Sequence, residues 1–383
     1  SDMESRPNTN VTQALRGQVA GVQFTDNGRP GQNGSILVRG PRSLSGGNDP
    51  LIILDGIYFN GSMIDINPND IASIDVLKDA SSAAIYGSRA ANGVVIVTTK
   101  EGSNTEGKPI IDLSANVGVS SPSKYLDLLA AGWAEVTTVS RRAAGLSPLE
   151  MAQDLASKPD NDWQDLMFGP ALMQNYALSV KGGGKYSTYY NSVGYTNQDG
   201  VMKGTNYQRY TLQSKQDFKK GIFQAGTNVV LTYDQSNPLY SVIRGGMVGH
   251  TLQAIPTWEQ YDENRTGGYG GLYGDVVNLT HPLGMVDDNL MKRYSDNVKI
   301  FANAYVSVEL MKGLKYKLNL TPDFQFYRYN SYEGLFDFGL AKHDITAVTE
   351  QQTRTRNILV ENLLTFDRTF GDHKVSALVG YTY

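Results

Sequence analysis

Apolar and polar side chains alternate along most of the chain after Pro109. In residues 298–308 the even-numbered positions are all apolar, whereas the odd-numbered positions include Lys299 and Asn303. Residues 223–233 and 314–320 alternate in a similar way. Because successive side chains of a β-strand point to opposite sides, each segment has one apolar and one polar face. The pattern predicts nine such strands, over about residues 109–119, 172–182, 185–196, 205–218, 221–234, 296–310, 313–329, 349–369 and 372–383.

The predicted connections alternate strictly between short and long. Tight turns fall near residues 182–184, 219–220, 312 and 370–371, and the other connections run for about 50, eight, 60 and nearly 20 residues. Short turns at one end and long loops at the other are typical of an outer-membrane β-barrel. Several strands exceed the usual five or six residues, and lengths near ten suit a tilted crossing of a bilayer. The first long connection also carries two apolar patterns that predict helical pieces over residues 126–144 and 149–157, the second capped by Ser147 and Pro148.

Residues 1–105 predict a separate, mixed α/β unit. Short apolar runs bounded by Gly, Pro, Asn and Asp predict strands at residues 22–25, 36–38, 51–54, 73–77 and 94–98. Helices are predicted over residues 11–16, capped by Asn10, and 80–86, capped by Asp79. Asp55-Gly56 is a hairpin-turn signal. The polar linker 101–108 sets the expected boundary between an N-terminal domain (1–105) and a second domain (106–383).

Composition narrows the possible functions. The formal charge of −4, from 34 basic and 38 acidic residues, argues against a dedicated nucleic-acid binder. The chain has no Cys, so disulfides, zinc–thiolate sites and Cys nucleophiles are excluded. The 23 Tyr residues suit a membrane–water boundary, whereas no run of 18 apolar residues predicts a transmembrane helix.

Nothing in the sequence predicts catalysis. The four His residues are scattered, no Ser nucleophile motif occurs, and the Gly-rich segment 267–274 lies inside a long loop rather than between a strand and a helix. We therefore expect no enzyme, no metal and no cofactor.

Five stretches together resemble the SusC-type family of TonB-dependent transporters. They read NVTQALRGQVAGV (10–22), SILVRG (35–40), PLIILDG (50–56), NPNDIASIDVLKDA (67–80) and AIYGSRAANGVVIVTT (84–99). The resemblance covers most of residues 10–102, and across the second domain only the strand rhythm matches. It implies an N-terminal plug inside an outer-membrane barrel of roughly 22 strands, in a Gram-negative bacterium of the Bacteroidota type.

The resemblance also implies the mode of action. TonB of the inner-membrane energy-coupling complex would pull the plug, and a SusD-like surface lipoprotein would close over the barrel as a lid. The cargo would be an oligosaccharide or, less readily, a peptide. Nine strands are fewer than such a barrel needs, and open sheet edges in hydrocarbon leave backbone groups unpaired. We therefore expect the remaining barrel strands to come from outside these residues.

Candidate residues follow from position and chemistry. Arg39 ends an apolar strand and would need carboxylate partners inside a plug, for which Asp75 and Asp79 are the candidates. Seven aromatic side chains in the long loops are candidates for contact with cargo or lid, or for packing of the loops: Trp133, Trp163, Tyr240, Trp258, Tyr261, Tyr269 and Tyr273. The rival functions are a passive porin, which needs no separate N-terminal unit, and a soluble all-β carbohydrate-binding protein or hydrolase, which needs no lipid-facing alternation.

Overall fold

The computed structural model of the protein describes residues 11, 12, 17, 22–25, 28–32, 34–38, 40, 43, 47–78, 86, 88–129, 132–238, 246–274, 276 and 279–383. Among these residues, no helix is both long enough and apolar enough to cross a membrane.

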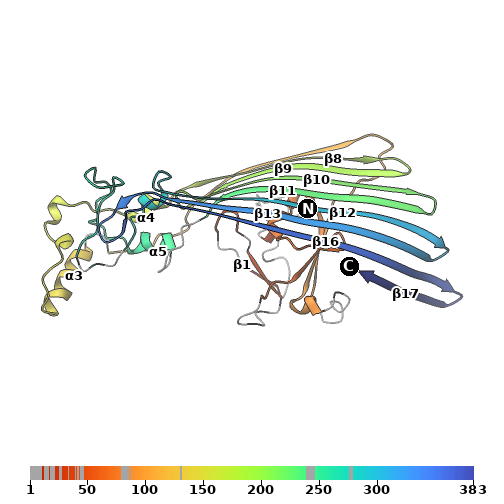
Figure 1. The fold of residues 1–383 in the computed structure, drawn as a ribbon, viewed down its shortest axis with the longest axis horizontal. Coiled ribbons are helices and arrows are strands. Elements are labelled where there is room, and N and C mark those ends of the chain that lie inside the picture. The colour runs from red at the N-terminus through yellow and green to blue at the C-terminus, as the bar shows by residue number, and fades with distance from the viewer. Residues whose placement is uncertain are drawn as a thin grey trace.

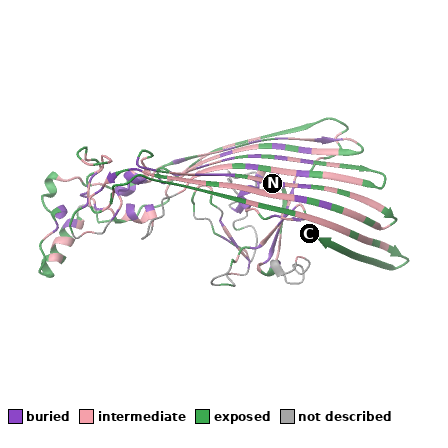
Figure 2. Ribbon diagram, viewed as in Figure 1, coloured by how far each residue is buried: buried purple, intermediate pink, exposed green. Residues whose placement is uncertain are grey.

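Within the described residues, nine long strands form one antiparallel sheet, which we call the wall. The strands are β7 (Ile110–Ser120), β8 (Ala171–Gly183), β9 (Ser187–Asp199), β10 (Asn206–Lys220), β11 (Phe223–Asn237), β12 (Met291–Met311), β13 (Leu314–Glu333), β16 (Ala347–Phe370) and β17 (His373–Thr382). Each pairs with its neighbour in the chain, and the short hairpin of β14 (Phe336–Asp337) and β15 (Lys342–His343) interrupts the sequence between β13 and β16. The sheet is open, and β17 is exposed along its whole length (Figure 2).

The nine predicted strands and the alternation of short and long connections are confirmed. One turn lies elsewhere than predicted: Lys219 and Lys220 belong to β10, and Gly221 and Ile222 make the turn. Gly221 has φ +61°, a left-handed conformation that lysine adopts less readily than glycine.

One face of the wall, which we call the outer face, carries exposed apolar rows in register. Leu178, Val193, Leu212 and Leu231 face one another across β8 to β11. Two residues further along each strand lies a row of tyrosines, Tyr176, Tyr195, Tyr210 and Tyr233, whose successive ring centroids are 6.4, 5.0 and 6.2 Å apart. An apolar band edged by aromatic rings is the surface that a barrel presents to lipid.

The N-terminal unit contains a four-stranded sheet in the order β4-β3-β6-β5. Its strands are β3 (Leu51–Leu54), β4 (Ile57–Tyr58), β5 (Ile71–Leu77) and β6 (Val94–Thr99), with β3 parallel to β6, and a separate hairpin joins β1 (Val22–Thr25) to β2 (Ser35–Val38). The described residues of this unit also form the 3₁₀ turns η1 (Met63–Asp65), η2 (Pro68–Asp70) and η4 (Ser88–Asn92). The five predicted strands are confirmed, whereas β4 has only two residues, too few to leave a periodic signal.

The predicted turn and helices of this unit have mixed outcomes. Asp55 and Gly56 turn between β3 and β4 with φ of +50° and +84°, as the hairpin signal predicted. Of the predicted helix 11–16, only residues 11 and 12 are described, and both are helical. The predicted helix 80–86 lies outside the described residues except for Tyr86.

The long connections gather at one end of the wall (Figure 1). They carry α3 (Gly132–Ala143), η5 (Glu150–Ala152), η6 (Leu155–Ser157), α4 (Trp163–Met167), α5 (Gly246–Gln253) and η7 (Gly284–Val286). We call these elements, with β14 and β15, the loop cluster. The helix α3 lies within the predicted segment 126–144, but 149–157 forms two 3₁₀ turns because Asp154, between them, adopts a left-handed φ of +50°.

The N-terminal unit lies against the other face of the wall, the inner face (Figure 1). Its apolar core includes Leu54, Phe59, Val95 and Val97 and extends onto the wall at Phe301. The loop cluster has its own core, built around Trp163, Trp258 and Phe338. The inner face of the wall is thus the place where the two domains meet.

Candidate functional site

Polar side chains of the wall hold residues 62–70 of the N-terminal unit. Asn67 caps η2 by accepting a hydrogen bond from Asn69 N at 3.0 Å, and Pro68 suits the first position of that turn. These short turns present polar atoms to the wall. Arg209, which is 1% exposed, donates to the carbonyl oxygen of Ile64, and Asn67 Nδ2 donates to Thr211 Oγ1 at 3.4 Å.

The same segment ends at Asp70, whose Oδ1 accepts a hydrogen bond from Tyr190 OH on β9 at 2.8 Å. Burial raises the pKa of Asp70, and the hydrogen bond from Tyr190 acts in the opposite direction. A further docking contact between the two domains is therefore made by a buried carboxyl group.

An ion pair joins the N-terminal unit to the wall near the loop cluster. Lys299 Nζ on β12 lies 2.5 Å from Asp65 Oδ2, and the Asp65 side chain is 3% exposed. Ser62 N donates to the same oxygen at 2.7 Å, and Thr232 Oγ1 donates to the Asp65 carbonyl at 3.2 Å. A cavity of about 340 Å³, which we call the outer cavity, is lined by both domains here, including Gln32 and Asp65 on one side and Tyr207, Asp234, Asn297 and Lys299 on the other.

A second ion pair lies nearer the short turns. Lys215 Nζ on β10 is 3.4 Å from Asp55 Oδ2 and 2.8 Å from Glu101 Oε1. Asp55 also accepts hydrogen bonds from Thr99 N (2.8 Å), Thr99 Oγ1 (2.6 Å) and Asn228 Nδ2 (2.7 Å). The Asp-Gly turn thus does more than reverse the chain, because its carboxylate ties β6 and two wall strands together.

A polar cavity of about 350 Å³, which we call the inner cavity, borders this second ion pair. Its lining includes Asp55, Lys215, Asn303 and Lys317. On β12, Phe301 lies between Lys299 of the outer cavity and Asn303 of the inner cavity, on the same face of the strand. The ring of Phe301 meets that of Phe59 edge-on, with centroids 5.2 Å apart. An aromatic contact therefore separates two polar cavities along the inner face.

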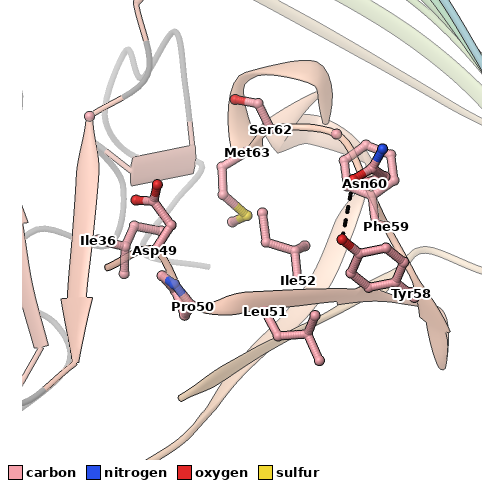
Figure 3. A pocket seen from close by; sticks show the side chains of 12 residues that line it. Ile36, Asp49, Pro50, Leu51, Ile52, Tyr58, Phe59, Asn60, Ser62 and Met63 are labelled. Atoms are coloured by element: carbon pink, nitrogen blue, oxygen red, sulfur yellow. Dashed lines mark hydrogen bonds between the residues drawn. The ribbon is translucent and has the colours of Figure 1, made fainter. Parts of the chain in front are cut away.

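A third cavity, of about 510 Å³, lies within the N-terminal unit itself. Ile36, Ile52 and Met63 line it together with Asp49, Asn60 and Ser62, and no wall residue contributes among those described (Figure 3). Tyr58 OH donates to Asn60 Oδ1 at 3.2 Å at its edge (Figure 3).

The carboxylates that contact the wall differ from the ones that the sequence suggested. Arg39 and Asp79 lie outside the described residues. Asp75 is exposed on β5, opposite Ile96 of β6, whereas Asp55, Asp65 and Asp70, like Glu101 in the segment before β7, are bound by wall side chains. Sequence reasoning missed these carboxylates because no local pattern reports which loop residue faces a partner far along the chain.

Three of the candidate loop aromatics contribute mainly to packing. Trp163 and Trp258 are 3% and 0% exposed, with ring centroids 5.7 Å apart, and Trp163 Nε1 donates to Ile255 O at 2.8 Å. They are therefore placed to hold the loop cluster together rather than to contact cargo. Tyr269 is half-buried and donates from its hydroxyl to Asp287 Oδ2 at 3.0 Å.

The other candidates are more accessible. Tyr261 and Tyr273 are 64% and 46% exposed, and the guanidinium of Arg265 lies 4.6 Å from the Tyr273 ring centre. Trp133 is half-buried on α3. Tyr240 lies outside the described residues.

A buried histidine lies at the centre of the loop cluster. His281 is 0% exposed, and its ring contacts those of Trp163, Trp258 and Tyr269 at centroid distances of 5.2, 4.6 and 5.1 Å. Burial lowers the pKa of His281 to about 4. Gly284 N donates to its Nδ1, so the neutral ring carries its proton on Nε2, which donates to Glu259 O at 3.1 Å.

Comparison with known proteins identifies the N-terminal unit and relatives of the chain. Residues 1–94 match the family model of the TonB-dependent Receptor Plug Domain. The chain is 32% identical over 399 residues to TonB-dependent receptor P26 of Formosa agariphila, covering 100% of the chain and 38% of that protein. It is also 32% identical over 313 residues to TonB-dependent receptor SusC of Bacteroides thetaiotaomicron, covering 79% of the chain and 30% of that protein.

Solved structures show the same fold. The RagAB peptide importer in its closed-closed state superposes with a TM-score of 0.81 at 24% identity, covering 100% of this chain and 46% of that one. The chain thus spans less than half the length of each of these proteins.

A plug domain docked by polar contacts on an antiparallel wall defines a TonB-dependent receptor. Within that class the chain belongs to the SusC-type family, as the plug and part of the β-barrel. The expected fold class and the expected location in the outer membrane of Bacteroidota are confirmed, and the family is one of transporters and receptors rather than enzymes. The family assignment also replaces the rival interpretations as a passive porin or a soluble carbohydrate-binding protein.

Proposed function

We propose that the whole protein imports a bulky nutrient across the outer membrane by TonB-dependent displacement of its plug. The observation that carries the proposal is the polarity of the contact between plug and wall. The ion pairs of Lys215 and Lys299, several side-chain hydrogen bonds and two polar cavities lie there, and among the described residues the apolar core of the plug meets the wall at Phe301, Val230 and Leu359. Water can replace polar contacts as a plug moves, whereas an apolar interface would resist separation.

The cargo that we propose is an oligosaccharide, with a peptide as the second candidate. Carboxylate, amide and phenol groups line the outer cavity at Asp65, Asp234, Asn297 and Tyr207. Such groups donate to and accept from sugar hydroxyls, and the exposed rings of Tyr261 and Tyr273 are suited to stacking on sugar faces. The peptide alternative is favoured by the likeness in fold to a peptide importer.

Two partners belong to the proposal. A SusD-like surface lipoprotein would cover the loop cluster, with Trp133, Tyr261 and Tyr273 as the candidate contacts, and TonB would act on the plug from the side of the short turns. We place the domain boundary at 105/106, in the irregular segment that precedes β7 at Ile110. Further strands would pair with the open edges of the wall, because unpaired backbone groups in hydrocarbon are costly.

A reversible cross-link tests plug displacement. These 383 residues contain no Cys, so the Asp55→Cys, Asn228→Cys double variant gives them one engineered pair, which would bridge β3–β4 and β11. We expect oxidised cells to stop growing on an oligosaccharide as sole carbon source and to recover on reduction, while either single variant transports in both states. Uptake at the wild-type rate with the cross-link formed would show that this part of the plug does not move.

A further inference from the structure

The outer face of the wall has a hollow near the short turns. Its floor consists of small side chains that face one another across two strands: Ala225 and Thr227 on β11, opposite Val306 and Ala304 on β12. Larger side chains border it, and the cavity measures about 650 Å³, within the range of ordinary ligand sites.

The border of the hollow is mostly apolar. Phe218 faces Ala225 from β10, and Leu318 and Leu320 face Val306 and Ala304 from β13. These side chains alternate with side chains of the inner face, such as Asp217, which borders the inner cavity, and Asn319, so they point away from the plug. The hollow therefore opens toward the lipid, and its natural occupant is a hydrocarbon chain.

Polar side chains also border the hollow, among them Ser187, Tyr189 and Gln216. Gln216 is exposed on β10 opposite Thr227, on the same face as Phe218, and its amide has no hydrogen-bond partner among the described residues. An amide in an apolar environment without a partner is costly. An ester carbonyl of a lipid beside the hollow would accept a hydrogen bond from it.

Positive charge lies at the end of the hollow nearest the turns. Lys220, two residues beyond Phe218, and Lys185 are both exposed, and their Nζ atoms lie 5.5 and 5.3 Å from the centre of the Tyr186 ring. In the described part of the chain, neither has a carboxylate within 4.0 Å. Two clustered cations without an acidic partner fit a phosphate group.

The position of these lysines along the membrane normal agrees with a membrane surface. Ten residues separate Lys220 from Tyr210 of the tyrosine row, which is about 34 Å along a strand, or about 26 Å across a bilayer at a tilt of about 40°. That matches an apolar band of about 25 Å between two boundaries. Lys220 therefore lies at the boundary on the short-turn side, where phospholipid head groups would be.

We propose that this hollow binds one anionic phospholipid of the periplasmic leaflet. Its phosphate contacts Lys185 and Lys220, its glycerol and ester groups lie over Ala225 and beside Gln216, and its acyl chain continues over Ala304. The proposal rests on the membrane orientation that the proposed function requires, but not on a particular cargo. Failure of lipid binding can therefore be told apart from failure of the proposed import.

The test is retention of lipid by the purified full-length protein, measured by native mass spectrometry after exchange into detergent with added phosphatidylglycerol or phosphatidylethanolamine. We expect one retained phosphatidylglycerol and little phosphatidylethanolamine. Lys185→Gln with Lys220→Gln should weaken retention by roughly thirtyfold at low salt. Ala304→Phe, and independently Ala225→Leu, should abolish it by filling the hollow while the lysines stay in place.

Matched controls separate this site from general effects. Lys203→Gln removes a charge from a turn at the loop end, and Ala115→Phe adds a ring to the outer face on β7, opposite Tyr176. Both should retain the lipid as the wild type does. Equal retention of both lipids, retention unchanged in Ala304→Phe and Ala225→Leu, or burial of the hollow between two copies of the protein would overturn the proposal.

Discussion

Replacing Lys215 by Met tests whether the inner ion pair holds the plug. The side chains of Lys215 and Asp55 are 10% and 11% exposed, so the variant leaves a largely buried carboxylate without its cation. Removing one partner of a buried pair destabilises by about 3–5 kcal/mol. Asp55 keeps its bonds from Thr99 and Asn228, and the inner cavity admits water, so we expect a smaller loss, about 1–3 kcal/mol.

Hydrogen exchange of the whole protein measures this loss locally. Each 1.4 kcal/mol is a factor of ten, so amides of residues 51–58 and 94–101 should exchange roughly 5- to 150-fold faster in Lys215→Met. Amides of the loop cluster should be unaffected. Lys203→Met, in an exposed turn, is the control for loss of a lysine. Adding Asp55→Asn to Lys215→Met should restore much of the protection, because the unpaired charge is gone.

Unchanged exchange in Lys215→Met would refute the reasoning, since it would mean that water already screens the pair fully. Equal acceleration in the loop cluster would point instead to a general loss of stability.

Three further predictions concern facing, sealing and pH. Ile300→Arg should lower assembly yield more than Asn303→Arg, because Ile300 faces lipid whereas Asn303 borders the inner cavity. A charge on the outer face costs roughly 2–4 kcal/mol at mid-bilayer and less toward the tyrosine row, which lies two residues from Ile300, and equal amounts of heat-resistant barrel on gels would contradict the register. Phe59→Ala should join the two cavities and raise single-channel conductance in planar bilayers, and a closed channel would show that another contact seals them. The loop cluster should lose stability as the pH falls from 6.5 to 4, by at most about 3 kcal/mol, because His281 binds a proton there in the unfolded chain and not in its buried position. In His281→Phe the unfolding temperature should depend less on pH over that range, and an unchanged pH dependence would exclude His281 as the cause.

The wall was predictable from sequence because the signal for each strand, the alternation of apolar and polar residues, lies within the strand itself. Alternation with period two fixes both the strand and its faces, and Lys299 and Asn303 do point inward while Val298 and Ile300 point outward. Long strands repeat the signal many times. The two-residue strand β4 and the five-residue helix α4 give it no room to repeat, and they were missed.

The contact between the domains was not predictable, because its information is not local. Asp65 and Lys299 are 234 residues apart in the chain, and Asp55 and Asn228 are 173 apart. Each residue is an ordinary polar group until the fold brings its partner near. The loop tryptophans show the converse: their residue type suggested contact with a ligand or packing, and only the fold shows that Trp163 and Trp258 are buried.

The arrangement of polar and apolar contacts on the inner face explains how one interface can both seal and release. Apolar contact excludes water, and the pairing of Phe59 with Phe301 lies where the outer and inner cavities would otherwise join. The ion pairs on either side are strong only while dry, since charges in water attract about a quarter as strongly as at a protein surface. A pull that first moves the Asp55–Gly56 turn would expose Lys215 to water and weaken the Lys215–Asp55 ion pair. The force would then act on the contact between Phe59 and Phe301. Release would then proceed stepwise from the short-turn side, each step exposing the next contact to water, which is the direction from which we propose that TonB acts.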